Sequence, residues 1–271
     1  MKLTHENYYS PEANEAYMST SQFKAFDRCE AAALAELRGE YQPAPSTAML
    51  VGSYVDAAVS GELDSFQEMH PEIFKRDGTL KAEYQNAETI YRRLMSDDLF
   101  RRMVSGKNQV ILTGDIAGVP FKAKLDSLLS GEQAAEIIEK YPNTAEWLGL
   151  GTGAIVDLKV MRDTQPEWSE GERVPFPVAW GYDIQGAVYQ ALEGHGLPFF
   201  IAAVTKENPA DIELIGIDQS SLDARLREVE TRAPRYQAIK EGYLEPTRCG
   251  TCAYCRSTKR LTSFVDYREM C

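Results

Sequence analysis

The chain has 271 residues, of which 44% are hydrophobic, so it can form one large domain with a substantial core. Its formal net charge of −12 excludes a generally basic surface that would coat nucleic acid, although a local basic groove beside an acidic metal site is compatible with it. The sequence holds no apolar run long enough to span a bilayer and does not start with a signal peptide. We therefore expect a soluble, cytoplasmic protein with a single domain over residues 1–271 and no membrane partner.

Residues 1–107 are predicted to be mainly helical. After Ser19, which can cap a helix, apolar side chains recur at helical spacing as far as Leu37. We expect one helix here, with Cys29 inside it. The preceding residues 1–16 are predicted from their composition to be among the least ordered parts of the chain.

Further helices are expected at residues 48–59, 62–70 and 84–105. The first carries Asp56 one turn after Gly52, where it is either a solvated carboxylate or part of a site. The helix at 84–105 carries four arginines that form either a solvated face or contacts to phosphate. They are Arg92, Arg93, Arg101 and Arg102.

After these helices the hydrophobic pattern changes to a period of two. Residues 110–116 and 119–129, joined by a turn, predict a β-hairpin. On its second strand Lys122, Lys124 and Asp126 share one face, because alternate residues of a strand point the same way. Three charged side chains on one face of such a strand are unusual.

Residues 153–160 form a short run rich in β-branched residues, which predicts a buried strand. Asp157 and Lys159 stand two residues apart in it, so both side chains point to the same face. Since an unpaired buried charge is costly, these two side chains need each other or a ligand. A structural ion pair is the ordinary explanation, and the rest of the chain must decide whether the pair does chemistry.

A loop rich in Pro, Glu and Gly is expected at residues 164–177, followed by a helix at 178–193. Gln185 and Tyr189 stand four residues apart on this helix and project from one face. The remaining elements are strands at 199–205 and 212–217 and a long amphipathic helix at 220–243.

The residues that could carry chemistry follow one another on a helix, a strand, a second strand and a helix. They are Asp56, then Asp126, then Asp157 and Lys159, then Gln185 and Tyr189. This order resembles the PD-(D/E)XK nuclease superfamily and is most similar to the RecE-like exonucleases of phages and prophages. Asp157-Leu158-Lys159 matches the (D/E)-x-K motif, whereas Asp56 stands where many relatives carry His.

The resemblance implies an α/β (α+β) fold with a restriction-endonuclease-like core, in which helices flank a mixed central β-sheet. Residues 1–107 would form a helical N-terminal part and residues 108–218 the catalytic core. Residues 219–271 would form a C-terminal helix and a Cys-rich tail.

The resemblance also implies roles in phosphodiester hydrolysis, which needs an activated water and stabilisation of charge on the attacking and leaving oxygens. Carboxylates that hold Mg²⁺ or Mn²⁺ serve both needs. Lys159 would position or deprotonate the water, and Gln185 and Tyr189 would orient the site or contact the DNA backbone. The implied metal ligands are Asp56, Asp126, Asp157 and the Leu158 carbonyl.

Five cysteines in a chain of this kind are more typical of metal ligands or free thiols than of disulfides. Cys249, Cys252 and Cys255 form a C-x2-C-x2-C run, a tight spacing typical of metal binding. The run looks similar to that of AddB-type and CRISPR-adaptation nucleases, where one early cysteine and a C-terminal triplet hold a [4Fe–4S] cluster. This likeness implies Cys29 as the fourth ligand, with Cys271 as its rival. A structural Zn²⁺ is the alternative metal, and reduced free thiols are the alternative without metal.

The leading hypothesis is thus a divalent-metal-dependent DNA exonuclease, acting 5′ to 3′ on linear double-stranded DNA in phage-type recombination. Its implied partners are DNA ends and a single-strand annealing protein, and processive relatives form homo-oligomeric rings. The candidate phosphate contacts are Lys122, Lys124 and the four arginines of the 84–105 helix. The alternatives are an Fe–S-type nuclease acting on single strands and a non-catalytic DNA-binding or scaffold protein on the same fold.

Overall fold

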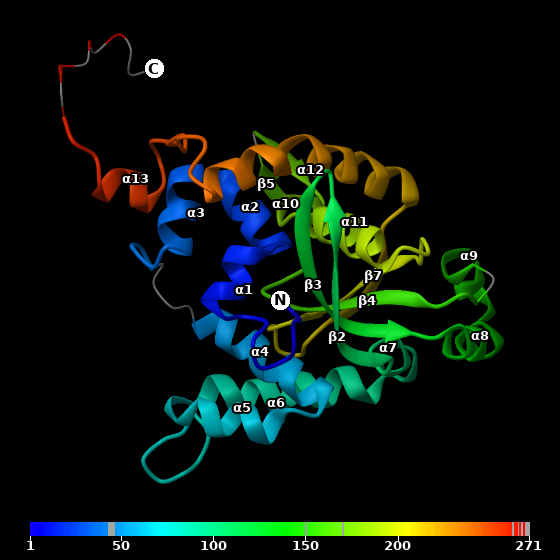
Figure 1. Ribbon diagram of the computed structural model, residues 1–271. Helices are drawn as coiled ribbons and strands as arrows, with labels where there is room; N and C mark the ends of the chain where they lie inside the picture. The colour runs from blue at the N-terminus through cyan, green and yellow to red at the C-terminus, as the bar shows by residue number, and fades with distance from the viewer. Residues whose placement is uncertain are drawn as a thin grey trace.

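The computed structural model describes residues 1–42, 47–149, 151–169, 171–261, 263–264, 266 and 268. In this part of the chain a six-stranded mixed β-sheet has helices packed on both of its faces (Figure 1), which confirms the predicted fold class. None of the helices among the described residues combines the length and the hydropathy needed to cross a membrane.

The N-terminal region is more ordered than its composition suggests. It contains α1 (Pro11–Ala16), β1 (Met18–Ser19), α2 (Thr20–Arg28) and α3 (Glu30–Leu37). Helix α1 begins where Ser10 Oγ accepts a hydrogen bond from the backbone N–H of Ala13 at 3.2 Å. The prediction of one continuous helix after Ser19 was wrong, because Cys29 adopts an extended backbone (φ −166°, ψ 104°) and separates α2 from α3.

The next helices form a layer on one side of the sheet (Figure 1). They are α4 (Thr47–Ser60), α5 (Leu63–Met69), α6 (Ala82–Ser96) and α7 (Asp98–Met103), with a 3-10 turn at Pro71–Ile73 after α5. The single helix predicted at 84–105 is therefore two helices. The break falls at Asp97, whose Oδ1 caps α7 by accepting a hydrogen bond from Phe100 N at 2.9 Å.

The sheet is built around β3 (Val119–Leu129), which pairs with three other strands. The other strands are β2 (Lys107–Ile116), β4 (Ala154–Met161), β7 (Phe199–Thr205) and β8 (Ile212–Gly216). The order is β1-β3-β4-β7-β8, and β2 pairs with β3 as the predicted hairpin. Strands β1 and β3 are parallel, as are β4 and β7, while the pairs β2–β3, β3–β4 and β7–β8 are antiparallel.

The pairing between β3 and β4 is short. It ends with Ser127 opposite Val156, although β4 stays paired with β7 as far as Met161. One further step in the same register would place Asp126 opposite Asp157. The sheet therefore opens between β3 and β4 at the level of these two carboxylates.

Strand β4 is buried on both faces, and its side chains alternate between two hydrophobic cores. Ile155 belongs to the core that includes Phe23 of α2. Val156 and Leu158 belong to the core that includes Tyr54 of α4. This double burial explains why the strand reads as a nearly continuous apolar run, in which two charged residues stand out.

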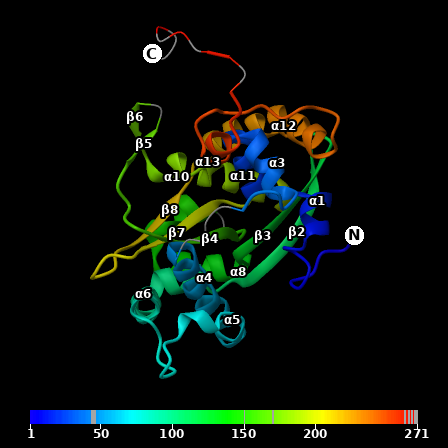
Figure 2. The ribbon, with the colours of Figure 1, turned by 90° about the vertical axis from the view of Figure 1, so that its left-hand side faces the viewer.

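Between β3 and β4 the chain makes the helical excursion α8 (Gly131–Lys140) and α9 (Ala145–Leu148), with a 3-10 turn at Pro142–Thr144. Ser130 and Gln133 form a capping box at the start of α8. After β4, the segment predicted to be a loop contains the small hairpin β5 (Glu167–Ser169) and β6 (Glu172–Val174), which projects beyond the sheet in Figure 2.

The helix predicted at 178–193 is also two helices, α10 (Phe176–Ala179) and α11 (Tyr182–Glu193). They are separated at Gly181, whose left-handed backbone (φ +62°) favours glycine. Helix α12 (Gln219–Lys240) contains Pro234 without ending there, and the short α13 (Ala253–Ser257) carries the end of the cysteine run. Helices α2, α11 and α12 cover the face of the sheet opposite α4.

Candidate metal-dependent active site and cysteine centre

The gap between β3 and β4 is part of a cleft of about 370 Å³ that opens beside the N-terminal segment. The predicted catalytic residues all line it: Asp126, Asp157, Lys159, Gln185 and Tyr189. A second hollow, of about 430 Å³, lies among α1, α2 and α3 and contains none of them. Residues from β3, β4 and α11 thus meet in one place, as their order in the sequence predicts.

Where β3 and β4 separate, the Asp126 side chain takes the place of a backbone carbonyl of β3 as a hydrogen-bond acceptor for β4. Its Oδ2 accepts a hydrogen bond from the backbone N–H of Leu158 at 2.9 Å. Burial, together with the nearby charges of Asp157 and Asp56, raises the pKa of Asp126 well above its usual value. The carboxylates of this cleft therefore repel one another, and a bound cation would relieve that repulsion.

Asp157 is held from two sides and is only 1% exposed. Its Oδ1 accepts a hydrogen bond from Gln185 Nε2 at 2.7 Å, and its Oδ2 forms an ion pair with the Lys159 ammonium. Burial alone would lower the pKa of Lys159, but the charges of Asp157 and Asp126 raise it above its usual value. In this arrangement Lys159 carries a positive charge beside the carboxylates.

Gln185 and Tyr189 connect α11 to both strands. Gln185 Nε2 lies 2.8 Å from Tyr189 Oη, which in turn donates to the backbone carbonyl of Lys124 at 3.3 Å. Both side chains are 9% exposed. Of the two roles that the resemblance implies, these contacts favour the orientation of Asp157 over contact with the DNA backbone.

Asp56 reaches the same acidic group from α4. It shares a small recess with Asp126 and Leu158, and its Oδ2 accepts a hydrogen bond from Gln109 Nε2 at 3.3 Å. Burial raises the pKa of Asp56 against the opposing effect of the Lys159 ammonium. Gln109 did not stand out in the sequence, where its only signal is a polar residue at the start of an apolar strand.

Lys122 lines the cleft but is occupied by contacts within the protein. It is 1% exposed, and its Nζ donates to the Tyr8 carbonyl at 2.5 Å and to Asn14 Oδ1 at 2.7 Å. Burial lowers its pKa to about 8. Both lysines line the cleft, but the Lys122 ammonium is engaged by the N-terminal segment, whereas Lys124 is half-buried. Of the two predicted DNA contacts, this geometry favours Lys124.

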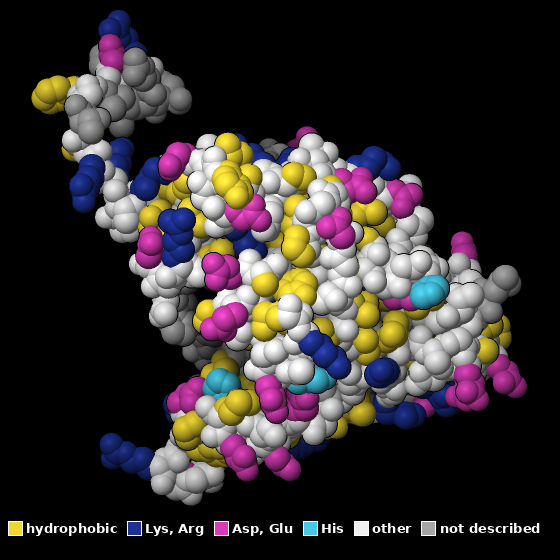
Figure 3. Space-filling view, in the orientation of Figure 1, with side chains coloured by type: hydrophobic (Ala, Val, Ile, Leu, Met, Phe, Trp, Pro, Cys, Tyr) yellow, Lys and Arg dark blue, Asp and Glu magenta, His cyan; other side chains and the backbone are white. Residues whose placement is uncertain are grey.

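Ion pairs within the protein engage Arg92 of α6 and both Arg101 and Arg102 of α7. Arg92 Nη2 lies 3.2 Å from Glu88 Oε2, Arg102 Nε lies 2.8 Å from Asp98 Oδ2, and Arg101 pairs with Asp98 as well. On the face that Figure 3 shows, Lys and Arg side chains are interspersed with Asp and Glu. Of the two alternatives that the sequence leaves open for these arginines, the ion pairs favour a solvated face.

The sequence reading also missed aromatic side chains around the cleft. Tyr8 and Tyr9 line it from the segment that was expected to be poorly ordered. The centroid of the Tyr182 ring lies 5.1 Å from Lys159 Nζ and 5.4 Å from Lys24 Nζ. The signal available for Tyr8 and Tyr9 was Ser10-Pro11, a typical helix start that anchors the preceding residues.

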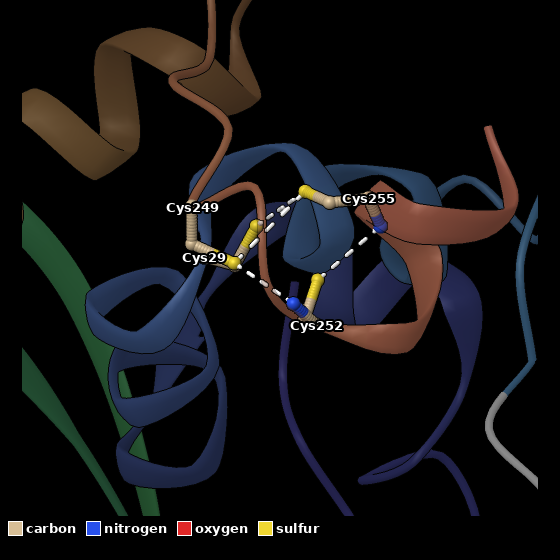
Figure 4. Close-up of side chains that lie close together, drawn as sticks. All are labelled: Cys29, Cys249, Cys252 and Cys255. Carbon is tan, nitrogen blue, oxygen red and sulfur yellow. Dashed lines mark hydrogen bonds between the residues drawn. The ribbon is translucent and has the colours of Figure 1, made fainter. Parts of the chain in front are cut away.

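Four cysteines form a second site at the junction of α2, α3 and the C-terminal region (Figure 4). The sulfur atoms of Cys29, Cys249, Cys252 and Cys255 all lie within 4.8 Å of one another. Cys255 Sγ is 3.6 Å from Cys29 Sγ and 3.9 Å from Cys249 Sγ. The predicted ligand set is thus brought together, while Cys271 lies outside the described residues.

The spacing of these sulfurs fits one tetrahedral ion. Four thiolates at about 2.3 Å from a Zn²⁺ ion form a tetrahedron with edges of about 3.8 Å, close to the two distances in this site. A [4Fe–4S] cluster binds each cysteine through a different iron and spreads the ligands further apart. The N–H groups of Cys252 and Thr251 lower the pKa of the Cys249 thiol to about 6, which favours the thiolate that a metal needs.

The cysteine centre rests on a fixed junction. Glu30, directly after Cys29, forms an ion pair with Arg235 of α12 at 2.7 Å. The same carboxylate accepts a hydrogen bond from Thr247 N at 2.7 Å, and Ala31 N donates to the Thr247 carbonyl at 3.0 Å. These contacts hold the C-terminal segment against α3 beside the cysteines.

The chain resembles known proteins over most of its length. It matches a family described as a PDDEXK-like domain of unknown function (DUF3799) over residues 19–137 and 144–258. A crystal structure of a protein from Eubacterium rectale that bears the name "Putative exonuclease" is 39% identical in sequence, with a TM-score of 0.86 over 100% of this chain and 98% of that one. No curated protein matches. By its sequence and its structure, the chain belongs to the PDDEXK-like family DUF3799.

Proposed function

We propose that this protein is a divalent-metal-dependent exonuclease that hydrolyses phosphodiester bonds of DNA in the cleft between β3 and β4. The observation that carries the proposal is the meeting of Asp126, Asp157 and Lys159 in one open cleft. The name of the Eubacterium rectale protein supports the class of reaction.

The residues present fit a divalent cation. Among the described residues, buried Asp157 Oδ2 has no hydrogen-bond partner. It forms an ion pair with the Lys159 ammonium. Carboxylate oxygens are the donors that Mg²⁺ and Mn²⁺ prefer. Asp126, Asp157 and the Leu158 carbonyl would hold the ion, with Asp56 at its edge. A cation held there would supply charge stabilisation at phosphorus and acidify the attacking water.

The protein's own groups do the remaining work. Gln185 fixes the Asp157 carboxylate through its 2.7 Å hydrogen bond, and Tyr189 fixes Gln185. Lys159, as an ammonium, would position the attacking water and offset negative charge that grows on the phosphate. Lys124 would hold a neighbouring phosphate at the cleft wall.

The finer assignment is that the enzyme shortens linear double-stranded DNA from its 5′ ends in phage-type recombination, with a single-strand annealing protein as partner and a homo-oligomeric ring as assembly. The likeness to RecE-like exonucleases supports these points. The test is degradation of linear and covalently closed circular duplex, labelled at either the 5′ or the 3′ end, in Mg²⁺ and in EDTA. We expect only the linear substrate to be degraded, and only in Mg²⁺. The 5′-labelled end should release labelled mononucleotides before the 3′-labelled end does.

We also propose that Cys29, Cys249, Cys252 and Cys255 hold one structural Zn²⁺, on the strength of the sulfur spacing. The second candidate is a [4Fe–4S] cluster, as in the Fe–S-type nucleases that act on single strands. The likeness of the cysteine pattern favours this candidate. Anaerobic purification with metal analysis separates the two: one zinc in a colourless protein supports the first, and iron with sulfide in a brown protein supports the second.

A further inference from the structure

Tyr9 presents an aromatic ring at the rim of the proposed active site. It is 70% exposed, whereas its neighbour Tyr8 is 5% exposed. Both residues line the cleft that contains Asp126 and Asp157. An exposed tyrosine is by itself ordinary on a protein surface, so the position of this one beside the carboxylates gives it meaning.

The backbone is anchored both before and after the Cα atom that carries the Tyr9 ring. The Tyr8 carbonyl accepts a hydrogen bond from Lys122 Nζ at 2.5 Å, and the Tyr9 carbonyl accepts one from Asn14 Nδ2 at 3.3 Å. Lys122 also donates to Asn14 Oδ1 at 2.7 Å, which closes the arrangement. A ring on a fixed backbone loses little conformational entropy when a ligand covers it.

The surroundings of the ring suit a nucleotide. Tyr8 meets Tyr9 edge to face, with centroids 4.9 Å apart and an interplanar angle of 84°. Lys124 Nζ lies 5.2 Å from the Tyr9 centroid. Sites for single-stranded nucleic acid combine these two features, an exposed aromatic face for a base and a cation for the adjoining phosphate.

We propose that Tyr9 stacks on an unpaired nucleobase of the strand being cut, while Lys124 holds the phosphate next to that base. The inference rests on the proposed nuclease function and adds the state of the substrate at the site. A paired base inside a duplex is stacked on its neighbours and offers no free face. A base of the cut strand other than the outermost one would therefore have to leave the duplex before it reaches the ring, and a single-stranded end would enter directly.

The experiment uses the full chain with a 3′-fluorescein-labelled single-stranded oligonucleotide, with Ca²⁺ in place of Mg²⁺ so that binding is measured without cleavage. Anisotropy titrations compare the wild type with Tyr9→Ala and Tyr9→Phe. Tyr243→Ala is the matched control, because Tyr243 is 78% exposed and lies outside the residues that line the cleft. A series of the same oligonucleotide is also prepared in which one nucleotide is abasic. The abasic position differs by one nucleotide from each member to the next, starting at the unlabelled end.

Tyr9→Ala should weaken binding about tenfold, since removal of one stacking aromatic typically has an effect of this order. Tyr9→Phe, which keeps the ring, and Tyr243→Ala should bind like the wild type. An abasic nucleotide at one particular position should weaken binding of the wild type by a similar factor. The same abasic nucleotide should not weaken Tyr9→Ala further, because the two changes remove the same contact.

Equal affinity of Tyr9→Ala and the wild type would overturn the stacking proposal. The proposal would also be overturned if, at every abasic position, the loss of affinity from the abasic nucleotide added fully to the loss from Tyr9→Ala. No base would then depend on the ring. Either result, with Mg²⁺-dependent cleavage intact in the wild type, would leave the nuclease proposal standing. A wild type that neither binds nor cleaves DNA would overturn both.

Discussion

Asp126 and Asp157 lie one step beyond the last pair of the β3–β4 ladder, on strands that separate at that level. The separation leaves the N–H of Leu158 without a ladder partner from β3, and the Asp126 carboxylate takes that place. The break in the sheet thus creates the cleft and turns two carboxylates toward it. Burial and mutual repulsion make this arrangement costly without a cation.

Divalent metal should therefore stabilise the folded protein. At a concentration of Mn²⁺ about 100 times its dissociation constant, the melting temperature of the wild type should rise by roughly 5–10 °C. Asp126→Asn should lose this rise, and Asp64→Asn, an exposed carboxylate on α5, should keep it. Differential scanning fluorimetry with and without Mn²⁺ measures both. A full rise in Asp126→Asn would place the ion elsewhere.

Replacing Asp157 should reveal how strongly Lys159 depends on it. The crowding of carboxylates suggests that Asp157→Ala would relieve repulsion, but the ion pair with Lys159 and the hydrogen bond from Gln185 argue for the opposite sign. Breaking one side of such a buried pair typically costs about 3–5 kcal/mol. Urea unfolding should show this loss for Asp157→Ala and a partial recovery for Asp157→Ala/Lys159→Met. Unchanged stability of Asp157→Ala would mean that repulsion dominates the site.

Lys122 and Lys124 should behave differently although they are neighbours on one strand face. Lys124→Ala should reduce the slope of log affinity for DNA against log salt by about 1, as expected for the loss of one phosphate contact. Lys122→Met should lower the melting temperature, because the N-terminal segment loses its anchor, and should leave that slope unchanged. Anisotropy titrations at several salt concentrations test this pair. A smaller slope in Lys122→Met would show that Lys122 contacts phosphate as well.

Asp98 should stabilise α7 and α8 in a pH-dependent way. Hydrogen bonds from Lys140, Arg102 and Tyr141 lower the pKa of Asp98 below its ordinary value of 3.8. A carboxylate with a lowered pKa in the folded state adds stability above its unfolded pKa, and this stability is lost as the pH falls through the folded pKa. The melting temperature of Asp98→Asn should thus lie below that of the wild type at neutral pH and approach it in acid. A constant difference at all pH values would contradict the assignment.

Cys29→Ser should release the metal of the cysteine centre. Cys29 and Cys255 are 226 residues apart in the sequence, so the centre closes a very long loop and restricts the unfolded chain strongly. We expect loss of stoichiometric zinc and a melting temperature lower by roughly 10 °C. Cys271→Ser, at a position outside the described residues, is the control and should change neither. The reverse pattern would make Cys271 the fourth ligand.

The sequence carried much of the fold and the candidate site because their signals are local. A charged pair inside the apolar run of β4 is visible without any structure, and so is the order of helices and strands around it. The alternation of β4 between two cores follows from the period of a strand. The meeting of Cys29 with the C-terminal cysteines was predicted only through the likeness to other nucleases.

What the sequence did not predict depends on distant contacts or on single breaks. Lys122 is buried by residues 114 and 108 positions away, Tyr8 and Asn14, and no local pattern distinguishes it from Lys124. The sequence of α6 and α7 reads as one helix, because the two are divided only by the cap at Asp97. Tyr9 lies in a segment that its composition predicts to be poorly ordered, and contacts with Lys122 and Asn14 fix the segment in place.

The most direct test of the account is the single-turnover rate of hydrolysis of a linear DNA duplex in Mg²⁺ by the wild type and by Asp157→Asn, purified side by side. Asn keeps the size of the side chain and an acceptor for Gln185 but removes the charge that holds the ion. We predict Mg²⁺-dependent cleavage by the wild type and a rate at least about 1,000-fold lower for the variant. Equal rates for the two proteins, or a wild type that does not cut DNA, would contradict the assignment of the cleft.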